Sequence, residues 1–219
     1  MISRLPSWVK YGAFILALIA GMINVIGLLS FEHQAVSHLS GTASMIGAQF
    51  IAGKSLNLYH LIGLILSFVL GASLSGALLY GGQLKLGHHY DLALWIEAAL
   101  ILLALYALQH GFYWGSLVAS CACGLQNALA TTYSGAVVRT THLTGIFTDI
   151  GLMLGQGIRG DKLDTRKLIL FGCIIAGFVL GGILGAYLFQ YLYFWTLIFP
   201  ALACMGSAIW YRVYSKRRG

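Results

Sequence analysis

Long runs of apolar residues, separated by short polar or charged stretches, fill almost the whole of this 219-residue chain. A helix needs about 20 mainly apolar residues to cross the hydrocarbon core of a bilayer. Six runs come close to that length and predict transmembrane helices. Two others, 37–52 and 142–157, are shorter and rich in hydroxyl, amide and histidine side chains. The pattern predicts helical segments over 9–29, 37–52, 60–81, 92–109, 114–131, 142–157, 168–189 and 194–212.

Composition supports the membrane interpretation. The chain is 59% hydrophobic and 9% charged, whereas a soluble domain carries roughly a quarter charged residues. A soluble globular enzyme is therefore excluded, and we predict an all-α polytopic membrane protein with a single membrane domain over 1–219. The 28 glycines are about twice the usual proportion. Small residues let helices approach closely in lipid, so the excess predicts tight helix packing.

Three local matches, in the same order along the chain, indicate an internal duplication. They pair 21–24 with 124–127, 38–47 with 142–151 and 71–76 with 177–182, at offsets of 103, 104 and 106 residues. Any one match could arise by chance in a chain rich in glycine and leucine, but three with slowly drifting offsets are hard to dismiss. We predict two repeats of four helical segments each, over about 9–110 and 114–213.

The distribution of Lys and Arg predicts the topology, because these residues accumulate in short cytoplasmic loops. With a cytoplasmic N-terminus, eleven of the thirteen lie inside if all eight segments cross, and twelve if 37–52 and 142–157 are re-entrant. Both termini are therefore predicted to face the cytoplasm, at a bacterial inner membrane. Four crossings per repeat would make the repeats parallel, and three would make them inverted. We favour eight helical segments with the second and sixth short and buried.

Polar residues of the membrane region gather in two stretches, 24–49 and 126–156. Unpaired polar groups in lipid cost several kcal/mol, so these side chains should face inward, toward each other or toward a water-filled cavity. The candidate substrate-binding or pathway residues are Asn24, His38, Ser40, Thr42, Gln126, Asn127, Thr141, His142, Thr144 and Thr148.

Several of these residues have two interpretations. Asn24 and Asn127 would either bind a solute or ion through their amides, or join helices by hydrogen bonds. His38 and His142 would either gate the pathway by titrating near neutral pH, or simply cap the short helices.

Two carboxyl groups fall within apolar runs. Asp149 would serve either as a proton carrier or as the partner of Arg139 in an ion pair. Glu97 is expected near the outer headgroups, where its carboxyl group is solvated.

The sequence resembles the YoaK family of uncharacterised multi-pass bacterial inner-membrane proteins. The resemblance rests on the segments 124–128 and 140–145, on Gly21 with Asn24, and on the segment 40–42, and it covers nearly the whole chain. It implies a multi-pass inner-membrane protein with a supposed transport role and no assigned substrate. The family pattern has Asp in place of Asn24 and Asn in place of Thr42, so this chain lacks two polar groups that the family has available.

Candidate chemistry favours transport over catalysis. No nucleophile, acid–base pair or metal cluster emerges that would define an enzyme, so neither a metal nor another cofactor is expected. The cations lie at segment ends and do not line one face, which argues against a nucleic-acid partner. Repeats, short interrupted helices and polar groups are typical of a transporter or channel for a small polar solute or ion. The alternative is a structural, assembly or signalling membrane protein without a pathway, and its oligomeric state stays open.

Overall fold

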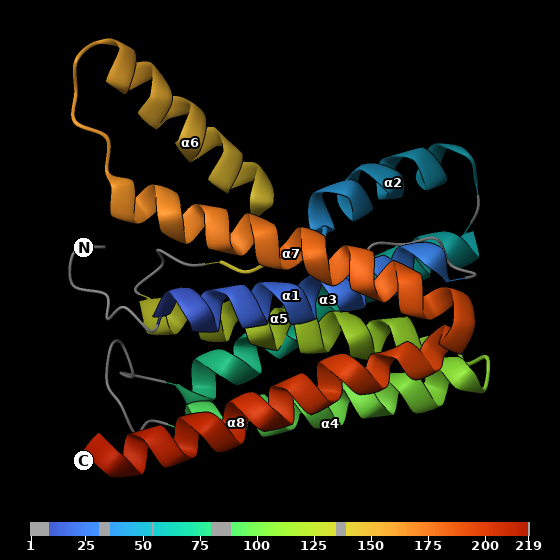
Figure 1. Ribbon diagram of the computed structural model, residues 1–219. Coiled ribbons are helices and arrows are strands. Elements are labelled where there is room, and N and C mark those ends of the chain that lie inside the picture. Colours follow the sequence, from blue (N-terminus) through green and yellow to red (C-terminus); the bar gives the residue numbers. More distant parts are fainter. Residues whose placement is uncertain (1–8, 31–35, 54, 80–88, 135–138, 219) are drawn as a thin grey trace.

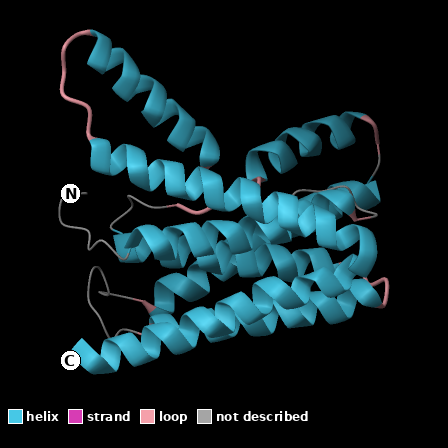
Figure 2. Cartoon of the chain, in the orientation of Figure 1, coloured by secondary structure: helices cyan, strands magenta, loops and turns pink. Residues whose placement is uncertain are grey.

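The computed structural model describes residues 9–30, 36–53, 55–79, 89–134 and 139–218 (Figure 1). Within them all regular secondary structure is helical (Figure 2), as expected where water is absent and each segment must satisfy its own backbone polar groups. The helices are α1 (Val9–Leu29), α2 (Leu39–Ile51), α3 (Ser55–Leu78), α4 (Tyr90–Gln109), α5 (Trp114–Ser134), α6 (Leu143–Ile158), α7 (Thr165–Leu192), the short 3-10 helix η2 (Tyr193–Leu197) and α8 (Ile198–Arg218).

Each predicted segment coincides with one α-helix, and most boundaries agree within a few residues. Residues 80 and 81, the predicted end of the third segment, lie outside the described residues. Four described stretches are long and apolar enough to cross a membrane, which defines a multi-pass membrane protein. They are Val9–Leu29, Leu56–Leu78, Tyr90–Gln109 and Thr165–Lys216, the last running through α7 and α8.

The helix α5 is not among these four stretches, although the sequence predicted a crossing there. It contains 21 residues but carries several polar side chains, among them Ser116, Ser120 and Gln126, which are buried. Because α5 packs against both α3 and α4, these side chains face protein and not lipid. A central helix of this kind has a lower mean hydropathy than its length would suggest.

Two pairs of helices pack side by side in parallel, α1 with α7 and α3 with α5. In the first pair the contacts advance together along both helices, from Leu18 against Gly181 to Met22 against Gly185. Figure 1 shows α1 and α7 running toward one end of the bundle, and α3 and α5 toward the other. The helix α4 packs between α5 and α8.

Glycines make these two pairings possible. A Cβ atom on Gly181 would overlap the backbone carbonyl of Leu18, and one on Gly21 would overlap that of Phe178. In the other pair, a Cβ atom on Gly71 would overlap the backbone carbonyl of Cys121. The glycine excess therefore brings helix backbones into direct contact, as the composition predicted for helices in lipid.

The short helices α2 and α6 lie outside this packed bundle. The end of the bundle at which α1 begins and α8 ends, marked N and C in Figure 1, is called the terminal end below. Since α1 runs away from the terminal end and α3 runs toward it, the chain between them enters and leaves at the opposite end (Figure 1). Likewise, α5 runs toward the terminal end and α7 runs away from it, so the chain that contains α6 leaves and re-enters the bundle at the terminal end (Figure 1). Each short helix therefore lies between two long helices that meet at the same end of the bundle.

The expectation that α2 and α6 are buried is wrong. Thr42 is the one buried residue of α2, and Ile146 that of α6. The glycine excess predicted tight helix packing, but Gly41, Gly47 and Gly151 in these two helices have no atom within 4 Å of the place a Cβ atom would take. The packed bundle is complete without these helices, because its glycine contacts already join the longer ones.

A glycine ends each short helix. Gly53 follows α2 and Gly160 follows α6, with φ of 66° and 95°, a backbone conformation that other residues adopt only at a cost. After α6, the backbone N–H of Gly160 donates to Gly157 and that of Asp161 to Gln156, at 3.0 and 3.2 Å. This is the Schellman arrangement that closes a helix C-terminus.

The apolar core consists of two clusters, one toward each end of the bundle. The cluster at the terminal end includes Leu94, Leu125 and Leu170, and the other includes Ile23, Ile101 and Leu197. Both clusters draw on α1, α4, α5 and α8. Any polar residue at the junction of the clusters is consequently surrounded by protein.

Candidate functional site

Val36 and Ser37, which precede α2, are held in the bundle by polar contacts. Asn24 is buried, and its Oδ1 accepts hydrogen bonds from Ser37 Oγ at 2.8 Å and from the Ser37 backbone N–H at 3.3 Å. The carbonyl oxygen of Val36 accepts a hydrogen bond of 2.9 Å from Ser120 Oγ on α5. Asn24 lies five residues before the end of α1, so Ser37 is bonded roughly 8 Å back from that end of the helix.

The linker between α5 and α6 is held by the same kind of contact. Asn127 Oδ1 accepts from Thr141 Oγ1 at 3.3 Å, and the preceding residue, Gln126, accepts from Thr140 Oγ1 at 3.4 Å. Gln126 is buried, and its Nε2 has no hydrogen-bond partner within the described residues. Both predicted asparagines therefore position a linker through an amide oxygen.

Each short helix begins at a histidine. His38 and His142 occupy the N-cap positions of α2 and α6, and neither side chain caps the backbone, so the capping role considered for them is not seen. The half-buried ring of His38 meets the ring of Phe178, in the middle of α7, edge-on with 5.8 Å between centroids. The ring of His142 lies over Gly145, where a Cβ atom would overlap it. The first N–H groups of both helices lack side-chain acceptors, and such helix N-termini favour anions and hydrogen-bond acceptors.

The hydroxyl groups of the short helices bond to their own backbone. Thr148 Oγ1 donates to the carbonyl of Thr144 at 2.9 Å, and Thr42 Oγ1 to that of His38 at 3.4 Å. The exposed Ser40 likewise accepts a bond of 3.1 Å, from Ser44, through its carbonyl oxygen. Thr144 and Thr148 are exposed, and internal bonding of this kind lets hydroxyl groups remain in apolar surroundings.

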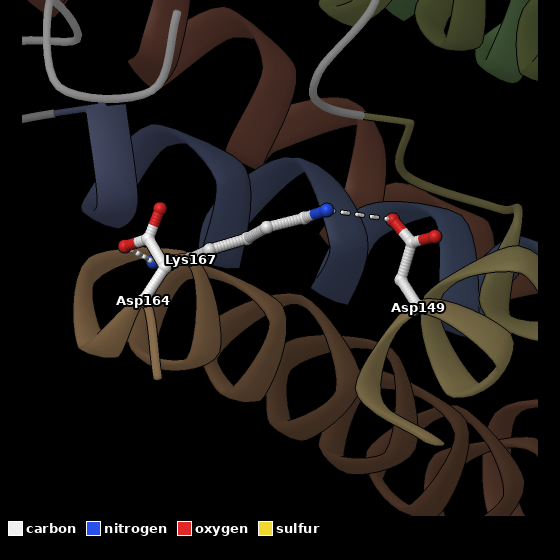
Figure 3. A network of polar contacts seen from close by, with 3 residues as sticks. All are labelled: Asp149, Asp164 and Lys167. Carbon is white, nitrogen blue, oxygen red and sulfur yellow. Dashed lines mark hydrogen bonds and ion pairs between the residues drawn. The ribbon is translucent and has the colours of Figure 1, made fainter. Parts of the chain in front are cut away.

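Asp149 forms an ion pair, with a partner other than the predicted Arg139. Its Oδ2 lies 3.1 Å from Nζ of Lys167 near the start of α7 (Figure 3). Lys167 also lies over the ring of Phe171, 5.2 Å from its centroid, and its backbone N–H donates to Asp164 Oδ1 at 3.1 Å. The pair ties α6 to α7, two helices that otherwise contact each other little.

Among the described residues, α2 and α6 do not pack against each other along their lengths, although both begin over the middle of α7 in Figure 1. The first stretch instead contacts helices of the second half of the chain, through Ser120 on α5 and Phe178 on α7. Each set of candidate residues thus surrounds the start of its own short helix.

Sequence reasoning placed Glu97 at the headgroups, and this is wrong. Its exposed fraction is 0%, because α5 and α8 both cover α4. The signal that would have found it is its position among apolar residues spaced at three and four along α4: Leu94, Ala98 and Ile101 are also buried.

The fold and its buried polar contacts define a multi-pass α-helical membrane protein. More narrowly, the chain belongs to the family DUF1275, described as a protein of unknown function, whose model matches residues 12–210. No curated protein and no solved structure matches the chain.

Proposed function

We propose that the protein is a transporter or channel for a small polar solute, with its pathway at the starts of α2 and α6. The observation that carries this proposal is the pair of short re-entrant helices whose uncapped N-termini begin beside bonded asparagine amides. Interrupted or short helices that point their N-termini into the membrane are a recurring means of binding solutes in transporters.

We also propose that the two halves of the chain are inverted repeats. The contact of Gly21 with Phe178 has a counterpart in that of Gly124 with Phe68. Likewise, the contact of Gly181 with Leu18 has a counterpart in that of Gly71 with Cys121. The positions on α1 and α5 differ by 103 and those on α7 and α3 by 110, so one set of contacts occurs twice. On α3 and α7 this pairing is shifted by four residues from the offset of 106 in the sequence match. Because α1 and α5 run in opposite directions (Figure 1), repeats related in this way are inverted.

A pathway at the helix starts fits solutes that carry hydrogen-bond acceptors. The free N–H groups of the first turns and the Nε2 group of Gln126 are all donors. The positive end of each helix dipole acts in the same direction. Thr144 lies in the first turn of α6, so the solute would pass next to it.

The test is uptake by liposomes that contain the full chain. The probes are glycerol, urea, chloride, nitrate and acetate. The entry of each probe into the liposomes is followed by light scattering after an osmotic step. Thr144→Asp places a carboxylate where the free N–H groups are and should reduce uptake at least tenfold for the transported probe. The matched control is Thr148→Asp, one turn further along the same exposed face, which should retain most of it. Uptake no faster than in empty liposomes for every probe, or equal loss in both variants, would contradict the proposal.

Assembly without a pathway is the second candidate, and the outer face of α6 favours it. A shallow groove on this helix is lined by small and polar residues, among them Thr148, Gly151, Gly155 and Gln156. Faces of this composition join helices in membranes. Under this candidate, Gly151→Leu would dissociate an oligomer seen by cross-linking in the membrane, whereas transport by the monomer predicts no change in cross-linking.

A further inference from the structure

A cavity of about 390 Å³ lies between α1, α4, α5 and α8, toward the terminal end of the bundle. Its lining is mostly apolar and includes Leu16, Leu94, Leu129, Ser207 and Tyr211. Along α4 the last lining residue toward the bundle centre is Leu94, and along α8 it is Ser207. The cavity therefore approaches the junction of the two core clusters from one side.

Glu97 lies one helical turn beyond the base of this cavity. It follows Leu94 by three residues on α4, which places it on the same face and roughly 4.5 Å further along the axis. On α8, Cys204 precedes the lining residue Ser207 by the same three residues. The elements that form the walls of the cavity thus continue directly to the carboxyl group.

Among the described residues, no cation pairs with Glu97. Neither carboxylate oxygen has a hydrogen-bond partner of good geometry in the described part of the chain. The titratable groups that act on it are the thiol of Cys204 on α8 and that of Cys123 on α5, both of them buried. Its other neighbours in the core are apolar, such as Ala98 and Ile101.

We propose that Glu97 is a proton-binding site, which takes up and releases its proton by way of the cavity between α1, α4, α5 and α8. A carboxylate that is buried without a cation is strongly disfavoured, whereas the neutral acid is tolerated. An ionisable group placed inside a membrane domain marks an ion or proton pathway by default.

The other described carboxyl groups do not share these surroundings. Asp149 has a cation, Lys167, at 3.1 Å and is 44% exposed. Asp91 is half-buried at the start of α4, and Asp161 and Asp164 are exposed. Among the described residues, the proton-carrying role first considered for Asp149 therefore fits Glu97 better.

Labelling with dicyclohexylcarbodiimide tests the site in the wild-type chain. The O–H bond of a protonated carboxyl group adds across a C=N bond of this apolar reagent, and the acyl group then moves from oxygen to nitrogen to give a stable N-acylurea. No group leaves, so the peptide gains the whole reagent mass. The 90–109 peptide should be labelled at Glu97, at least tenfold more than at Asp91. Labelling should decline at alkaline pH, where the proton is released.

Infrared difference spectroscopy provides a measurement that is independent of reagent access. The wild-type protein should show the carbonyl stretch of a protonated carboxyl group, which shifts in D₂O and disappears reversibly at alkaline pH. Glu97→Gln should lack this band, and the control Asp91→Asn should retain it. A band that is undiminished in Glu97→Gln, or one that neither exchanges with deuterium nor responds to pH, would overturn the proposal.

Coupling of the proton to transport rests on the proposed function, and its test is separate. In liposomes that show solute uptake, a pH gradient should accelerate uptake by the wild type and by Asp91→Asn. For Glu97→Gln this acceleration should be at least tenfold smaller. Failure of all uptake would refute the proposed function alone, because the infrared band reports on Glu97 whether or not a solute moves.

Discussion

Replacing Gly181 by alanine tests whether the α1–α7 contact is as close as the structure shows. A Cβ atom at this position would lie 2.8 Å from the carbonyl carbon of Leu18 and nearer still to its oxygen. The next residue, Gly182, has no atom within 4 Å of the place its Cβ atom would take. Gly182→Ala is therefore a matched control, with the same chemical change one position along the same helix.

The expected magnitude follows from the overlap. Carbon atoms pack at about 3.5–4.0 Å, so α1 and α7 must separate by roughly 0.7 Å or more. No side-chain rotation relieves the overlap, because the obstacle at Leu18 is backbone. Overpacking costs about 1–3 kcal/mol, whereas alanine at the open position 182 gains ~0.5–1 kcal/mol in helix stability. The two variants should differ by about 1.5–4 kcal/mol, or roughly 3–16 °C in melting temperature.

The assay is thermal unfolding of both purified variants in one detergent, followed by circular dichroism and by size-exclusion chromatography after heating. Gly71→Ala, which would overlap Cys121 on α5, should behave like Gly181→Ala, and Gly76→Ala, with open space around it, should behave like Gly182→Ala. Equal melting temperatures for the crowded and open positions would refute the close backbone contact in that helix pair.

Three further predictions concern the re-entrant helices. In a variant without native cysteines, Ala52→Cys and Lys162→Cys should react with an impermeant maleimide from opposite sides of the membrane, whereas eight full crossings would put both on one side. Asn24→Ala should lower the free energy of unfolding by about 1–3 kcal/mol, because it leaves the backbone N–H of Ser37 without its acceptor. Asn127→Ala should lower it by only ~0.6 kcal/mol. Comparable melting temperatures for the two variants would contradict this order. Asp149→Asn should speed hydrogen exchange in α6 while changing overall stability by less than ~1 kcal/mol, and unchanged exchange would show that the ion pair does not restrain that helix.

The positions of the helices could be predicted from the sequence, because apolar runs bounded by charge determine where a chain can cross lipid. The directions in which the third to sixth segments run could not be predicted from the sequence. Lys and Arg support eight crossings almost as well as six, since Lys54, Lys85 and Arg139 all change side between the two topologies and the net count changes by only one residue. The deciding fact is tertiary: α1 lies parallel to α7 and antiparallel to α5 (Figure 1).

The candidate site was predicted in part. The asparagines and histidines do lie where the short helices begin, but the sequence left open whether Asn24 and Asn127 bind a solute or hold the chain. Their amide oxygens are used by Ser37 and Thr141, which the spacing of thirteen or fourteen residues across an irregular linker does not reveal. Glu97 was misplaced because a single carboxyl group in an apolar run gives no indication of which helices cover it.

The packing also changes how a transport movement can occur. Rocking one repeat against the other, a common movement in transporters built from two repeats, would separate α1 from α7 and α3 from α5, the two pairs joined by glycine contacts. Interiors packed at backbone distance resist such separation, so we infer that each pair moves as one body. Movement between the two bodies would then occur where they meet, at the smaller contacts of α1 with α5 and α8. Glu97 on α4 faces Cys204 on α8 beside that junction, so gain or loss of its proton would alter the cost of burying the carboxyl group there.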